Sequence, residues 1–312
     1  MQCIFCHKEA TASRSVEHII PESLGNKHHF LPKGYVCDEC NNYFAVKIER
    51  ELLDQPYFKS MRFRNEIVTK KGKHVKEKMI FPEAMMACDV EMHTTDSGPI
   101  MSFHDERLYE AVKDGKTHTM ITPYYPEPDY PSTKMSRFIA KCAYEYFLYI
   151  VGEENYELCV QDLLGDKSDV LKDLRKYARY GEGPYWNYNQ RRIYSEGDYL
   201  IYKDEMTPYE ILHEMRFFVR EYKHYPNGFI EAEIYFVMAI AGIEYAICIS
   251  DPNITEYQKW IEEHNGLSTL NDEDEIRCFS ISDVNPFLIG KNVEKPRENG
   301  LLTANMHPAS RS

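Results

Sequence analysis

The spacing of apolar residues predicts a small strand–strand–helix unit at the start of the chain. Phe44, Ile48 and Leu52 recur every four residues, which places them on one helix face and predicts a helix over residues 41–53. Ahead of this helix, β-branched residues within 15–20 predict a short strand. The stretch between them is rich in Gly, Pro and polar residues, so we expect a loop there.

The rest of the chain predicts a mixture of helices and strands. One helix is indicated by apolar side chains at helical spacing between residues 132 and 151: Met135, Phe138, Ile139, Cys142, Ala143, Tyr146, Phe147 and Ile150. Shorter helices are predicted over three ranges: residues 154–164, 168–180 and 252–264. Strands are predicted within residues 85–122 and 191–250, and a basic hairpin over residues 60–80 that turns at residues 71–73.

These elements predict an α+β protein with a small head and a larger body. We expect four segments: the head at residues 1–58, a basic hairpin or linker at 59–82, the body at 83–290, and a flexible tail at 291–312. The body is expected to be a mixed α+β domain with a role in regulation, targeting or dimerisation. Neither internal repeats nor low-complexity blocks divide the sequence further.

Charge separates the start of the chain from the rest. The net charge is −13, yet residues 1–80 contain 14 Lys and Arg against 10 Asp and Glu, whereas residues 81–312 contain 23 against 40. A mildly basic segment can hold a phosphate backbone that the acidic body would repel. The longest apolar stretch, residues 236–249, is too short to span a membrane, and no secretory leader is evident. We therefore expect a cytoplasmic protein.

Four of the nine cysteines form two pairs with the spacing of a zinc site. Cys3 and Cys6 form the first C-x-x-C pair, and Cys37 and Cys40 form the second. Two such pairs supply the four thiolates that a tetrahedral structural Zn²⁺ requires. The head has little apolar core of its own, so metal binding is expected to provide much of its folding free energy. The odd total of cysteines, without a framework pattern, predicts reduced thiols.

Between the two pairs stands an acid–imidazole dipeptide. Glu17 and His18 lie in Ser15-Val16-Glu17-His18-Ile19-Ile20-Pro21, and Asn41 directly follows the last paired cysteine. In this arrangement the head resembles the HNH (ββα-metal) endonucleases, in particular their zinc-stapled branch. The stretch after the second pair, from Glu49 through Pro56-Tyr57-Phe58 to Arg64, is similar to that of bacterial HNH proteins with a long C-terminal extension, which occur in restriction and phage-defence systems. The resemblance covers about the first 65 residues.

The resemblance implies a hydrolytic centre for phosphodiester bonds. His18 would be the general base, because a neutral imidazole accepts a proton from water near pH 7. Glu17 and Asn41 would hold one catalytic Mg²⁺, with Mn²⁺ as a substitute, apart from the structural zinc of the cysteines. The fold implied for the head is a ββα-metal nuclease domain.

Two features depart from the family pattern. Glu17 replaces the more common Asp, so its carboxylate reaches about one methylene further. The family often carries an Asn before the last cysteine pair that fixes the loop backbone, and the sequence leaves open whether Asn26 takes that place. Contacts to nucleic acid are expected from seven polar side chains in and after the head: Lys27, His28, His29, Lys47, Arg50, Arg62 and Arg64.

Two classes of function are compatible with these patterns. The first is a DNA endonuclease whose head cuts and whose body regulates or targets it, as a homodimer or with a protein partner. The second is a zinc-ribbon adaptor that binds nucleic acid or protein without catalysis. An adaptor has no need of an acid–imidazole pair beside Asn41, so the sequence favours the endonuclease.

Overall fold

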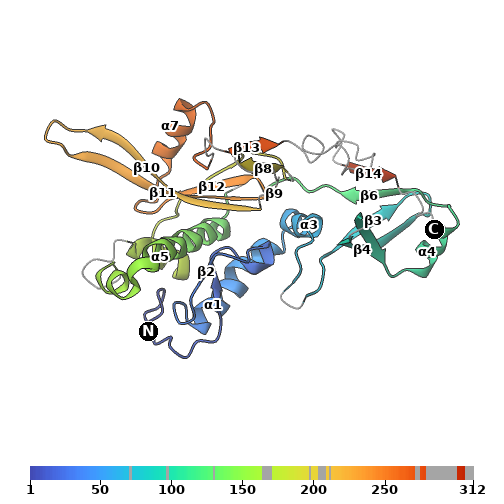
Figure 1. The fold of residues 1–312 in the computed structure, drawn as a ribbon, viewed down its shortest axis with the longest axis horizontal. Helices are drawn as coiled ribbons and strands as arrows, with labels where there is room; N and C mark the ends of the chain where they lie inside the picture. The colour runs from blue at the N-terminus through green and yellow to red at the C-terminus, as the bar shows by residue number, and fades with distance from the viewer. Residues whose placement is uncertain are drawn as a thin grey trace. The chain divides into compact units, whose positions relative to one another are not determined.

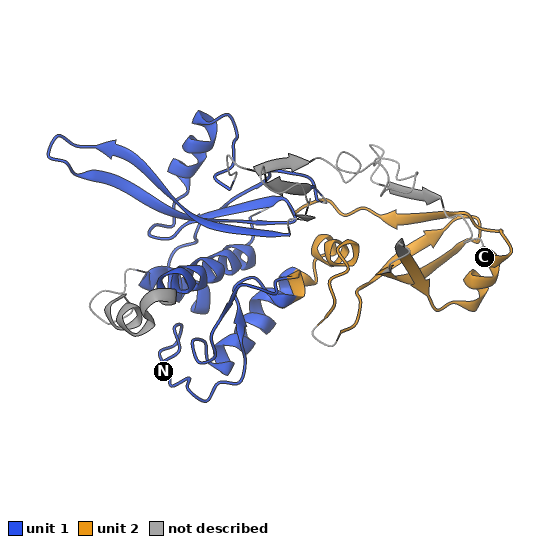
Figure 2. Cartoon of the chain, in the orientation of Figure 1, with its two compact units in different colours: residues 1–22, 26–52, 129–288 blue, residues 23–25, 53–128, 289–312 orange. Residues whose placement is uncertain are grey.

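The computed structural model describes most of the chain, in ten segments: residues 1–69, 72–95, 98–128, 131–163, 171–196, 198–202, 209–210, 212–270, 275–278 and 301–305. The chain divides into two compact units (Figure 2). Unit 1 comprises residues 1–22, 26–52 and 129–288. Unit 2 comprises residues 23–25, 53–128 and 289–312. We describe each unit by itself.

Unit 1 begins with the predicted strand–strand–helix unit. Strand β1 (Glu17–His18) pairs antiparallel with β2 (Phe30–Leu31). Helix α1 (Asp38–Phe44) follows and continues through a π-helical stretch, Ala45–Glu49, into α2 (Arg50–Leu53). The helix starts before residue 41 because the side chain of Cys37 caps it, and a short 3₁₀ turn (Glu22–Leu24) lies in the preceding loop.

The rest of unit 1 is an antiparallel sheet with helices packed against it (Figure 1). Its strand order is β10-β11-β12-β7, with bounds His213–His224, Ile230–Ile240, Ile243–Cys248 and Asn189–Arg192. The helices are α5 (Thr133–Leu163), α6 (Lys172–Tyr180) and α7 (Thr255–Glu263). A second small sheet has the order β13-β8-β9, with bounds Glu275–Cys278, Tyr199–Tyr202 and Tyr209–Glu210.

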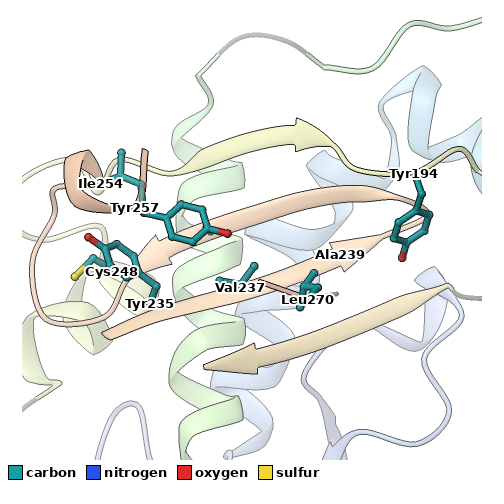
Figure 3. Close-up of a cluster of buried hydrophobic side chains, with 9 residues drawn as sticks. Tyr194, Tyr235, Val237, Ala239, Cys248, Ile254, Tyr257 and Leu270 are labelled. Carbon is teal, nitrogen blue, oxygen red and sulfur yellow. The ribbon is translucent and has the colours of Figure 1, made fainter. Parts of the chain in front are cut away.

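Alternation along β10 decides which helix each side chain meets. Phe217 points toward α5, where its ring lies 5.5 Å from that of Tyr146. Its neighbour Phe218 points to the other face, 6.1 Å from the ring of Tyr257 in α7. Successive strand residues face opposite sides of the sheet, so these two neighbouring phenylalanines pack against helices on both of its faces. Figure 3 shows the buried cluster on the α7 side, in which Tyr257 lies over the sheet beside Tyr235.

In the described part of unit 2, a five-stranded antiparallel sheet is accompanied by two helices. Its order is β14-β6-β3-β4-β5, with bounds Leu301–Asn305, Thr119–Pro123, Lys76–Phe81, Met86–Thr95 and Gly98–Phe103. The helices are α3 (Pro56–Arg64) and α4 (Glu106–Lys113). Its core is built from six apolar side chains: Phe63, Met79, Phe81, Val90, Leu108 and Met120.

The α+β class is confirmed, while several predicted elements need correction. The hairpin predicted over residues 60–80 is wrong, because α3 runs to Arg64 and β3 pairs with β4. Helix α5 is confirmed and extends to Leu163, where a separate helix was predicted. Helix α4 was missed within a range predicted as strands. The predicted turn at 71–73 and the tail at 291–312 lie partly outside the described residues, although residues 301–305 form β14.

The boundaries predicted at residues 58, 82 and 290 stay predictions, and the compact units group the chain differently. Most of the head shares unit 1 with residues 129–288. Across the described residues, no helix combines the length and hydropathy that a bilayer span requires.

Candidate metal centre and active site

Two local turns bring the cysteine pairs together. In the first, the amide of Cys3 donates to Lys8 O at 2.8 Å and that of His7 to Cys3 O at 2.9 Å, which closes a tight turn around Cys6. In the second, Cys37 is the N-cap of α1 and its sulfur accepts from the amide of Cys40 at 3.4 Å. Free amides at a helix N-terminus favour a negatively charged sulfur.

The four sulfur atoms lie within 4.8 Å of one another, and those of Cys6 and Cys37 are 3.6 Å apart. Four thiolates at the usual zinc–sulfur distance would be about 3.8 Å apart, so the donor set fits a tetrahedral Zn²⁺. The hydrogen bond from Cys40 lowers the pKa of Cys3 to about 4. Burial raises the pKa of Cys6 to about 11. Of these two sulfurs, that of Cys3 already favours the thiolate, which is the form that binds metal.

Helix α6 supports this cluster from outside the head. The guanidinium of Arg179 donates through Nε to Cys40 Sγ at 3.1 Å and stacks over the Tyr43 ring at 3.9 Å. Arg137 of α5 donates to the Tyr43 hydroxyl at 2.7 Å and to the carbonyl oxygens of residues 178 and 179 at 3.0 Å each. Arg179 thus donates to a ligand sulfur while Arg137 holds the backbone of Arg179. Supporting hydrogen bonds of this kind orient metal ligands.

Glu17 and His18 occupy the two residues of β1, and their side chains differ in burial. Glu17 is buried, whereas His18 is half-buried with its ring 6.0 Å from that of Phe30. Consecutive strand residues point to opposite faces. The acid and the imidazole are therefore adjacent along the chain but lie on different sides of the β1–β2 ribbon.

The buried side of β1 meets Lys141 of α5. Its ammonium group lies 2.6 Å from Glu17 Oε1 and donates to the carbonyl oxygens of His18 and Ile19 at 2.9 and 3.3 Å. Two further carboxylates, Glu49 and Glu145, approach it at 3.1 and 3.2 Å. Lys141 is completely buried, and a buried cation requires such partners.

The charges in this cluster shift two pKa values. Burial would lower the pKa of Lys141, but the carboxylates of Glu145 and Glu17 raise it well above its usual value, so the group stays an ammonium. Burial raises the pKa of Glu145 well above the ordinary range, against the attraction of Lys141. Three carboxyl groups share one cation, and Glu145, completely buried, retains its proton to higher pH than in water.

Two asparagines hold the backbone around β1. Asn41 is half-buried and its Nδ2 donates to Val16 O at 3.2 Å, which ties the start of α1 to the strand. Asn26 is buried and makes four backbone contacts: its Nδ2 donates to the carbonyl oxygens of Ile20 and His29, and its Oδ1 accepts from the amides of His28 and His29, all within 2.7–3.1 Å. Asn26 thus fixes the β1–β2 loop, which settles the question that the sequence left open.

The two predicted ligands of a catalytic ion, Asn41 and Glu17, differ in how well their surroundings suit metal binding. Asn41 is half-buried near β1, where a hydrated ion could approach. Glu17 is 5% exposed and its Oε1 already faces an ammonium at 2.6 Å. Mg²⁺ binds carboxylate oxygens at about 2.1 Å and keeps several waters, which needs open space that a buried ion pair lacks. As it lies, the Glu17 carboxylate does not fit this role.

The predicted nucleic-acid contacts fall in both units. In unit 1, Lys27, His28, Lys47 and Arg50 are exposed, and burial lowers the pKa of half-buried His29. In unit 2, Arg62 and Arg64 are half-buried on α3, and Arg64 Nη1 donates to Ser60 Oγ at 2.6 Å. The first set is open to solvent, while Arg64 is engaged with a side chain of its own unit.

A comparison with family models places these residues in a known context. A model described as HNH endonuclease matches residues 3–57, which contain both cysteine pairs, β1, β2 and α1. The start of the chain is therefore an HNH endonuclease domain with a four-cysteine cluster arranged for zinc, followed by a larger sheet-containing region. Comparisons with curated proteins and with solved structures each found no match.

Sequence reasoning missed the residues that support the site from a distance. Lys141 contacts β1, Arg179 contacts a cysteine sulfur and Glu49 contacts Lys141, and all three lie outside the motif. One signal was available in the sequence: Lys141 interrupts an apolar stretch at helical spacing, which predicts a buried helix face. A lysine in such a position requires a buried partner.

Proposed function

We propose that this protein is a metal-dependent endonuclease that hydrolyses phosphodiester bonds in DNA, with His18 as the general base. The match of residues 3–57 to HNH endonucleases is the observation that supports it most. The half-buried imidazole of His18 lies on the face of β1 opposite the Lys141 cluster. A neutral imidazole can take a proton from an attacking water near pH 7.

The zinc centre has a structural part in this proposal. Four cysteine ligands complete a tetrahedral shell and leave no position for water or substrate. The chemistry therefore belongs to the His18 side, where Asn26 and Asn41 fix the backbone on either side of β1. A second divalent ion, Mg²⁺ or Mn²⁺, is part of the proposal; its predicted ligands Glu17 and Asn41 stay a prediction, and the Glu17 carboxylate would first have to leave Lys141.

The biological setting is a further part of the proposal. The long acidic region after the HNH domain suits a regulating, targeting or dimerising role in bacterial restriction or phage defence. One head cuts one strand, so a homodimer would supply the two heads that a double-strand break needs. Light scattering on the purified chain measures this directly, and a monomer at all concentrations would remove dimerisation from the proposal.

The deciding experiment compares wild type with His18→Ala on supercoiled plasmid DNA in Mg²⁺ or Mn²⁺. Loss of a general base is expected to slow cleavage about 10²–10⁴-fold. His118→Ala, which removes an exposed histidine of unit 2, is the matched control and should cut like wild type. Equal rates for His18→Ala and wild type would reject His18 as the base. If wild type cuts with neither metal, the zinc-ribbon adaptor becomes the better description.

A further inference from the structure

The contacts of Lys141 fasten β1 to α5 at three points. Its ammonium reaches the Glu17 carboxylate and two successive backbone carbonyls, those of His18 and Ile19. The neighbouring thiol of Cys142 also donates to Ile19 O, at 3.0 Å. One helix thus holds the backbone of the catalytic strand from its buried face.

This fastening determines where the imidazole of His18 can lie. The His18 carbonyl oxygen is bonded to Lys141 at 2.9 Å, so the peptide plane that follows the residue is fixed. Pairing with β2 and the bonds of Asn26 and Asn41 hold the backbone on either side, and the Lys141 ammonium adds a bond at the His18 carbonyl itself. A catalytic base must be held within a fraction of an ångström of its productive position, and such precision comes from supporting contacts.

We propose that Lys141 is a positioning residue for His18, and that Glu17 acts as the anion of the Lys141–Glu17 pair rather than as a ligand of the catalytic ion. The inference rests on the proposed function insofar as it assigns His18 to catalysis. The shortest contact of the cluster, 2.6 Å, joins these two groups, and both are buried. In this proposal the acid that precedes the histidine serves to neutralise the buried Lys141 ammonium.

A double-mutant cycle tests this pairing. Lys141→Met is expected to lower kcat for plasmid cleavage about 100-fold with KM unchanged within twofold, because the DNA-binding face remains intact while the base is misplaced. It also leaves three carboxylates without their cation and lowers the thermal midpoint. The variant Glu17→Gln/Lys141→Met removes one of these carboxylates, and we expect it to regain at least tenfold in kcat and part of the midpoint.

A metal-binding role for Glu17 predicts a different result for the double variant. If Glu17 binds the catalytic ion, the double variant would cut no faster than Lys141→Met, and the proposal fails. Should Lys141→Met not fold, folding of the double variant would by itself show the coupling, since removing the Glu17 charge would have rescued the loss of Lys141. Effects on the midpoint that simply add would also overturn the pairing.

Metal binding gives a readout that needs no cleavage. We expect zinc-loaded Glu17→Gln to bind Mn²⁺, followed by electron paramagnetic resonance, within threefold of wild type. Glu22→Gln, which changes an exposed acid in the same loop, is the matched control. A loss of more than tenfold confined to Glu17→Gln would overturn the proposal. If wild type neither binds Mn²⁺ nor cuts DNA, the proposed function fails, while the midpoints of the cycle still decide whether the pair anchors β1.

Discussion

At the scale of single residues, the ionisation of the Lys141 cluster depends on burial. Glu145 approaches the ammonium less closely than Glu17, at 3.2 Å against 2.6 Å, and it is completely buried. A carboxylate in this position loses its hydration, and the more distant ammonium compensates for that loss less than it does for Glu17. Its proton is therefore retained to higher pH than in the unfolded chain.

This raised pKa makes stability depend on pH in a definite direction. Because the folded state keeps the Glu145 proton above pH 4.5, its contribution is fully present below that pH and is lost as the pH rises through the raised pKa. We expect Glu145→Gln, which is neutral throughout, to remove up to about 1.4 kcal/mol of this loss per pH unit. Urea unfolding at pH 5, 7 and 9 measures it. Parallel curves for the variant and wild type would contradict the assignment.

Single residues also show how far the sequence predicts the site. The cysteine pairs were predictable because short spacing places both members of each pair in one turn. The role of Asn26 stayed open because polar loop residues look alike until their backbone partners are known. The partner of Glu17 could not be predicted, because the Lys141 ammonium comes from a helix more than 120 residues further along.

At the scale of elements, α6 acts on the zinc cluster through its last turn. The Arg179 guanidinium is one hydrogen bond away from a cysteine sulfur, and Tyr43 lies against its face. Supporting donors of this kind typically change metal affinity by 10–100-fold.

We therefore expect Arg179→Gln to release zinc about tenfold more readily than wild type in competition with a colorimetric chelator. Lys172→Gln, which changes an exposed cation in the first turn of the same helix, should retain zinc as wild type does. If both variants lose zinc equally, the general charge of α6 and not the Arg179 contact would be responsible.

An element was easier to predict when its pattern of apolar residues repeats over a longer stretch of chain. Helix α5 repeats its pattern over several turns, and its inner face meets the sheet through Tyr146. Helix α4 has two turns and buries Leu108 alone, so its short pattern resembled a strand. Its N-cap, Asp105, accepts from the amides of residues 107 and 108 and was the available signal.

At the scale of the whole molecule, the HNH domain shares its core with later parts of the chain. The ring of Phe5, beside the first cysteine pair, lies 5.2 Å from that of Tyr144 in α5, and both are completely buried. Arg175 of α6 donates to the carbonyl oxygen of Phe5 at 2.8 Å. Removing these helices would expose the apolar side of the zinc centre and leave Glu17 without its cation.

We expect a fragment of residues 1–58 to bind zinc but to lack the cooperative thermal transition of the full chain. Zinc alone can order its four ligands, whereas the strand and loop of the proposed catalytic centre depend on α5. Circular dichroism melting of both proteins with equimolar zinc compares them. A fragment that melts cooperatively within a few degrees of the full chain would show that the predicted boundary at residue 58 delimits an autonomous domain.

The reach of Lys141 also has a consequence for timing during synthesis. The bond to His18 O joins residues 123 positions apart, so a ribosome adding about 5–20 residues per second needs roughly 6–25 seconds between making the two. For that interval the nascent head has its cysteines and His18 but lacks the helix that sets the strand. If the contacts of α5 position His18, the nascent chain cannot cleave DNA until α5 has left the ribosome.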